Sequence, residues 1–223
     1  MWRDAWLVAG KDLRIEARSR VVVNQVAPFA VLVLLLFAFA LGPDRAALAQ
    51  AAPGLFWLAV LFVALLSVQR SSSVETGEGT RDGLRLSGID PAGVFLGKAA
   101  AVALQLLVLE ALLTGGVLLL FGVTVRSPAV LAGSALAGTA GLSAVGVLYG
   151  ALSSGLRVRE TLLPFLLLPV VAPVLLCGTR AWEIAFGTAA KGGGDPFVGL
   201  LLVFAAVYLA LGVVVYGALQ EAP

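Results

Sequence analysis

The stretch RSSSVETGEGTRDGLRLSGIDPAGVFLGK, residues Arg70 to Lys98, separates two long apolar runs of this chain. Its charged residues are interspersed with glycines and with Pro91. Such a segment cannot lie in the hydrocarbon core of a bilayer, because its charges and backbone groups would find no partners there. We therefore predict a cytoplasmic loop between two membrane spans that docks on a soluble protein. A plain solvated connector is the alternative.

Composition places the rest of the chain in a membrane. Of the 223 residues, 60% are hydrophobic and only 13% are charged. This balance is typical of a multi-pass membrane protein, and the length leaves room for about six spans of ~20 residues. We therefore predict an all-α integral membrane protein with six transmembrane helices preceded by an amphipathic interfacial helix. The net charge of +2 comes from basic residues beside the spans, which indicates topology and not nucleic-acid binding.

Residues 1–20 are too charged to span a bilayer but have helical periodicity. One face carries apolar residues and another carries basic residues. The apolar face comprises Trp2, Trp6, Ala9, Leu13 and Ala17, and the basic face comprises Lys11, Arg14 and Arg18. This pattern predicts a helix lying along the membrane surface, with tryptophans at headgroup depth and cations meeting anionic lipid.

Residues 21–223 are expected to form a single six-span domain. The predicted spans cover about residues 21–41, 53–69, 94–123, 128–152, 161–177 and 197–219, with the cytoplasmic loop over residues 70–93. In the second span, Pro53 marks the start and Trp57 fits an aromatic belt at the outer interface. The fourth span has small residues at fourfold spacing, which favours close helix packing.

The fifth span contains Pro164, Pro169 and Pro173, so we expect it to be kinked or broken. Residues 178–196 then form the longest outer loop. That loop is either a short amphipathic helix re-entering the outer leaflet or a plain connection.

Two charged residues fall inside the third predicted span. Lys98 lies near its cytoplasmic end and can extend its ammonium to the headgroups, which predicts an interface anchor. Glu110 is twelve residues further, about 18 Å along a helix. It is a candidate for a transport path, and the alternative is a neutral acid hydrogen-bonded to a neighbouring helix.

The basic residues predict the orientation. All of them except Arg45, Arg126, Arg180 and Lys191 lie on the side of the N-terminus, the central loop and the loop near residue 155. By the positive-inside rule, both termini and the central loop are cytoplasmic.

The residue inventory argues against an autonomous enzyme. The chain has no histidine, its single cysteine is Cys177, and no phosphate-binding G-x-x-x-x-G-K-[ST] motif occurs. These absences exclude a disulfide within the chain, a cysteine-based metal site and a Ser-His-Asp triad. Energy for transport would have to come from an ion gradient or from a separate subunit.

Several motifs together resemble a known family. The central loop reads Glu75-x-x-Glu78-Gly79-Thr80-x-x-x-Leu84, followed by Pro91 and Lys98. The second span begins Ala52-Pro53-Gly54 with Trp57 nearby, and the fifth contains Leu168-Pro169-x-x-x-Pro173. With the six spans, this arrangement resembles the permease subunits of ABC type-2 exporters, and within them the haem exporter protein B (CcmB) family of cytochrome c maturation.

The resemblance implies a complex in a bacterial inner membrane. Two permease copies would associate with two copies of a cytosolic ABC ATPase, which binds the ATP, and with haem-handling membrane proteins. Residues Glu75, Glu78, Gly79, Thr80, Leu84 and Pro91 would form the segment that couples the permease to the ATPase. Haem would be a substrate of the complex and not a bound cofactor, because histidine is absent and the three tyrosines lie in apolar spans.

Three alternatives remain at this point. A type-2 ABC permease could export a lipid, a polysaccharide or a drug. An ion-coupled carrier predicts matching intramembrane charges in two halves, yet Glu110 has no counterpart in the fifth or sixth span. The third is a scaffold that assembles partners without moving a substrate.

Overall fold

A computed structural model of the chain describes residues 1–19, 22–75, 88–152, 159–189 and 193–221. All regular elements in these ranges are helical. They are α1 (Trp2–Ser19), the π-helix η1 (Val22–Val26), α2 (Ala27–Ala40), α3 (Arg45–Glu75), α5 (Pro91–Phe121), α6 (Pro128–Leu152), α7 (Arg159–Phe186) and α8 (Asp195–Glu221). The predicted all-α fold is confirmed.

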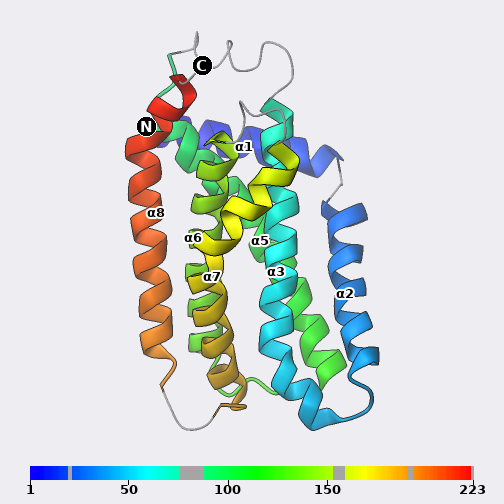
Figure 1. Cartoon of the computed structure of the whole chain (residues 1–223). Coiled ribbons are helices and arrows are strands. Elements are labelled where there is room, and N and C mark those ends of the chain that lie inside the picture. Colours follow the sequence, from blue (N-terminus) through cyan, green and yellow to red (C-terminus); the bar gives the residue numbers. More distant parts are fainter. Residues whose placement is uncertain (20–21, 76–87, 153–158, 190–192, 222–223) are drawn as a thin grey trace.

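The helices form an elongated bundle of membrane-spanning length. Five of them, α3 and α5 to α8, are long and apolar enough to cross a bilayer. A sixth candidate is a pair bent by 54°, formed by α1 and the helical segment Asn24–Ala40. Figure 1 shows α1 lying across one end of the bundle, with both chain termini at that same end. The end of α3 and the start of α5 also lie there.

Helix α6 packs against α3, α5, α7 and α8, and its small residues let these neighbours approach closely. Gly138 faces the ring of Trp57 and Gly146 faces Val68, both from α3. On another side, a methyl group at Gly141 would lie 2.8 Å from the ring of Phe204 in α8. The predicted close packing of this helix is therefore confirmed, and it matters because van der Waals contact is the main attraction between helices in lipid.

Helix α3 begins eight residues before the predicted start of the second span. The backbone N–H groups of Ala46 and Ala47 donate to Oδ1 of Asp44, at 2.9 and 3.3 Å, which satisfies donors that a helix start leaves unpaired. Pro53 therefore lies inside the helix and does not start it. Trp57 is only 1% exposed, so its predicted place in a lipid-facing aromatic belt is wrong.

Helix α7 continues to Phe186, so the predicted loop over residues 178–196 begins nine residues too early. Neither a separate re-entrant helix nor a plain loop describes residues 178–186. The reason is burial: Trp182 is fully buried and stacks on Phe56 of α3, with ring centroids 3.6 Å apart. The three prolines do not break α7, but Figure 1 shows the helix changing direction along its length.

Candidate functional site

The site of interest lies at the end of the bundle where α1 crosses α5. Two glycines one turn apart on α5 make the crossing close. A methyl group at Gly93 would lie 2.8 Å from the carbonyl oxygen of Met1, and one at Gly97 would lie 2.5 Å from that of Ala5. On α1, the buried residues are Ala5, Val8 and Ala9. The two helices therefore meet almost backbone to backbone, as small-x-x-x-small patterns allow.

The tryptophans of the predicted apolar face of α1 take no part in this contact. Trp2 and Trp6 are 75% and 82% exposed, because they flank the contact with α5 and do not fill it. The predicted helix is present, and the side of α1 that packs on the bundle carries small residues, a contact that the sequence pattern does not predict. Large indole rings would keep the two backbones apart.

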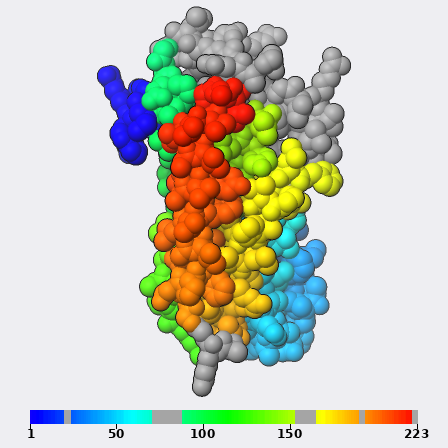
Figure 2. Space-filling model, turned by 60° about the vertical axis from the view of Figure 1, so that its left-hand side comes forward, coloured from blue at the N-terminus to red at the C-terminus, as the bar shows by residue number. Residues whose placement is uncertain are grey.

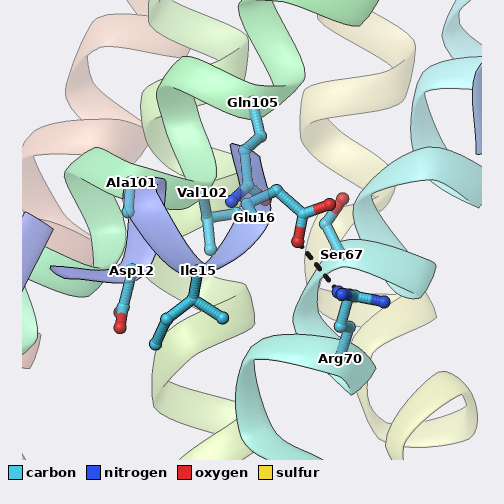
Figure 3. A pocket seen from close by; sticks show the side chains of 8 residues that line it. All are labelled: Asp12, Ile15, Glu16, Ser67, Arg70, Ala101, Val102 and Gln105. Atoms are coloured by element: carbon cyan, nitrogen blue, oxygen red, sulfur yellow. Dashed lines mark hydrogen bonds and ion pairs between the residues drawn. The ribbon is translucent and has the colours of Figure 1, made fainter. Parts of the chain in front are cut away.

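A polar cluster joins α1 to α3 and α5 beside this crossing (Figure 3). Nε of Arg70, near the end of α3, lies 2.8 Å from Oε2 of Glu16 in α1. The two side chains are 28% and 12% exposed. They border a cavity of about 30 Å³, which Ser67 and Gln105 also line. Partial burial strengthens such a pair relative to a surface ion pair, since less water screens it.

The cavity is large and polar enough to hold water. A cavity needs about 10–15 Å³ of free volume to hold one water molecule, which needs two to four polar partners. Ser67 is 3% exposed, and its Oγ has no hydrogen-bond partner among the described residues. Asp12 also lines the cavity, but its Oδ1 pairs with the ammonium of Lys11 at 2.9 Å.

The cluster fixes the position of α1 relative to the end of α3. Arg70 is five residues before the end of that helix, and α3 leads directly into the predicted coupling segment. A displacement of this end of α3 would therefore be transmitted to α1. The sequence feature that could have indicated this cluster is the acidic pair Asp12 and Glu16. The two residues are four positions apart and therefore lie on one edge of the helix. The prediction for residues 1–20 rests on the apolar and the basic residues and assigns no role to the acidic ones.

Two of the six predicted coupling residues belong to the described ends of α3 and α5. Glu75 is the last residue of α3, and Pro91 is the exposed first residue of α5. The carboxylate of Asp90 caps α5 by accepting from the N–H of Ala92 at 3.0 Å. The other four residues, Glu78, Gly79, Thr80 and Leu84, lie outside the described residues. Their coupling role stays a prediction.

The two charged residues of α5 are both buried. Lys98 is 3% exposed and directly follows Gly97, at the crossing with α1. Its ammonium therefore lies inside the protein and does not reach out along its surface, and its role as an interface anchor stays a prediction. Glu110 is also 3% exposed, and Oγ1 of Thr139 in α6 donates to its Oε1 at 2.6 Å.

Glu110 borders neither the polar cavity nor the apolar groove under α1 among the cavities of the described chain. Its second carboxyl oxygen, Oε2, has no hydrogen-bond partner within the described residues. The contact with Thr139 is the kind that a structural acid would make, and the role of Glu110 in a transport path stays a prediction. Over the same residues, no group of His, Cys, Asp and Glu side chains is arranged to hold a metal ion.

Comparison with known proteins gives a consistent result along the chain. A family model described as "CcmB protein" matches residues 3–221. The chain is 32% identical to "Heme exporter protein B" of Paracoccus denitrificans over 208 residues, which cover 90% of this chain and 89% of that protein. It is 31% identical to the protein of the same name in Haemophilus influenzae, over 86% of this chain and 87% of that one. It is 34% identical to "Heme exporter protein B" of Rhodobacter capsulatus, over 76% of this chain and 78% of that one.

Proposed function

This chain belongs to the CcmB protein family, and from that membership we propose that it is a membrane permease subunit of a haem exporter complex. The complex serves c-type cytochrome biogenesis in a bacterial inner membrane. Support comes from the match over residues 3–221 and from relatives named for haem export that align over most of their length. The helical bundle with its apolar spans fits such a subunit.

The subunit converts work done by a partner into movement of its own helices. ATP is bound and hydrolysed by a separate cytosolic ABC ATPase, which docks on the segment from Glu75 to Leu84. The observation that carries this proposal is the continuity of α3, which runs over 31 residues from Arg45 to Glu75 without interruption. A helix held by its neighbours along its length can transmit closure of the ATPase as a rigid-body shift.

Haem is the cargo of the complex and is not ligated by this subunit. Haem iron in proteins is held by His, Cys, Met or Tyr. The chain has no His, and its single cysteine, Cys177, is half-buried on α7. Tyr216 is 2% exposed and packs against Phe95. Haem-handling membrane partners therefore carry the haem, and a homodimer of this subunit drives its export or the release of a haem-loaded chaperone.

Substitutions in the coupling segment test this function. Replacing Glu78 or Leu84 with Ala should release or uncouple the ATPase, while membrane insertion stays normal because neither residue lies in a span. Co-purification of the ATPase and the level of holo-cytochrome c report the two effects. Glu183→Ala, at the opposite end of the bundle, is the control and should leave both unchanged.

Deletion of the gene should abolish holo-cytochrome c and spare b-type cytochromes. Normal holo-cytochrome c in the deletion strain would contradict the haem assignment and leave a type-2 ABC permease for a lipid, polysaccharide or drug. Intact ATPase association in both loop variants would contradict the coupling assignment.

A further inference from the structure

An apolar groove of about 490 Å³ runs beneath α1, on the side of the bundle formed by α5, α6 and α8. Trp2, Trp6 and Leu13 of α1 form its roof. Its floor includes Ala100 and Ala103 of α5, with Leu209 of α8 on the far wall. Figure 2 shows α1 extending sideways beyond the helices below it, next to the start of α5 and the end of α8.

Two acidic and two basic side chains of α1 lie on different sides of the helix. The acidic side chains of Asp12 and Glu16 are 15% and 12% exposed, because both lie against the bundle. Arg3 and Arg14 are exposed. They follow Trp2 and Leu13 directly in the sequence. Arg3 and Arg14 are eleven positions apart, about three helical turns, so both lie along one edge next to the groove roof. That edge is therefore cationic.

We propose that the groove binds an anionic phospholipid. Its acyl chain lies between the tryptophan roof and the alanine floor, and its headgroup pairs with Arg3 and Arg14. The apolar lining accepts a hydrocarbon chain, and indole rings prefer the depth at which chain and headgroup join. Basic residues near a membrane surface attract anionic headgroups. The bound lipid would hold α1 in its place across α5.

Tryptophan fluorescence can test this, because the four tryptophans fall into two classes. Trp2 and Trp6 border the groove, whereas Trp57 and Trp182 are buried within the bundle. The purified protein is placed in phosphatidylcholine nanodiscs with a minor fraction of brominated lipid, either phosphatidylglycerol or phosphatidylcholine. Bromine quenches indoles that it touches. Brominated phosphatidylglycerol should quench more strongly, and a Trp2→Phe/Trp6→Phe variant should lose the difference.

Two variants locate the binding site. Ala100→Phe fills the groove floor and should abolish the preference for the anionic lipid. Ala111→Phe is the matched control, since Ala111 is exposed on the same face of α5 three turns deeper and does not line the groove. It should keep the preference. Arg3→Gln/Arg14→Gln leaves the groove intact and should reduce quenching by phosphatidylglycerol to the level of phosphatidylcholine.

Three results would overturn the proposal: equal quenching by the two brominated lipids, an anionic preference that survives Ala100→Phe, or one that survives the double arginine variant. Arg3→Gln/Arg14→Gln changes only exposed side chains and should fold normally. It therefore tests the proposal even if Ala100→Phe fails to fold. The assay needs no ATPase. Its outcome is therefore independent of the coupling experiments.

Discussion

At the scale of single residues, the contact between Glu16 and Arg70 is the most informative one in the chain. An exposed ion pair contributes about 0–1 kcal/mol, whereas removing one partner of a fully buried pair costs about 3–5 kcal/mol. With side chains 12% and 28% exposed, this pair lies between the two cases. Its position matters more than its energy, because it connects α1 to the last turns of α3.

Removing the pair should weaken coupling more than stability. We expect Arg70→Ala and Glu16→Ala each to lower ATPase-dependent holo-cytochrome c formation while membrane insertion and ATPase binding persist. The exchanged double variant Glu16→Arg/Arg70→Glu should recover part of the loss, since opposite charges again face each other. Arg180→Ala removes an exposed pair with Glu183 at the other end and serves as control. Without recovery in the exchanged variant, the contact would have only a packing role.

At the scale of elements, one tryptophan of α3 packs against both α6 and α7. The ring of Trp57 lies between Gly138 of α6 and Gly178 of α7, and a methyl group at either glycine would collide with it. Trp182 packs against the same ring with centroids 6.3 Å apart. Three helices therefore meet at one side chain, in a region where only small residues leave room.

Filling this space should destabilise the bundle. Overpacking a filled core costs about 1–3 kcal/mol, so we expect Gly178→Ala to lower the midpoint of thermal unfolding in detergent. Gly199→Ala on α8 is the control, because nothing lies within 4 Å of the position that its methyl group would take. Equal midpoints for the two variants would show that α7 shifts to accommodate the methyl group.

The elements also show what the sequence could and could not predict. Helix α6 covers residues 128–152, the range in which the sequence predicts the fourth span, because Pro128 and a polar stretch bracket an apolar run. The predicted start of the outer loop at residue 178 is wrong, because polar residues such as Arg180 and Glu183 indicate a loop by composition. Burial of Trp182 holds that segment helical instead. The Glu16–Arg70 contact joins residues 54 positions apart, and no local pattern reports such a pairing.

At the scale of the whole molecule, the arrangement of the helix ends bears on orientation. Both termini, the end of α3 and the start of α5 share one end of the bundle (Figure 1). The four basic residues Arg45, Arg126, Arg180 and Lys191 belong to the opposite connections or helix ends by their place in the sequence. The positive-inside rule then predicts that the end carrying α1 is cytoplasmic.

Cysteine labelling checks this orientation. In a Cys177→Ser background, Ser72→Cys and Ser154→Cys should react with a membrane-impermeant maleimide only after the cytoplasmic side is opened. The native Cys177, which is half-buried on α7, should react from the outer side or not at all. Labelling of Ser72→Cys in intact cells would show that the predicted orientation is wrong. The segment from Glu75 to Leu84 could then not dock on a cytosolic ATPase.

The glycine crossing of α1 and α5 also sets an order of assembly during synthesis. Helix α1 is made first, yet its partners Gly93 and Gly97 are made some ninety residues later. At about 5–20 residues per second, the ribosome needs roughly 5–20 s to supply them. During that interval α1 lacks the helix against which it packs most closely, and the lipid surface suits its tryptophans and arginines. Its docking onto α5 must therefore follow emergence of the first turns of α5, after the preceding segments have left the ribosome.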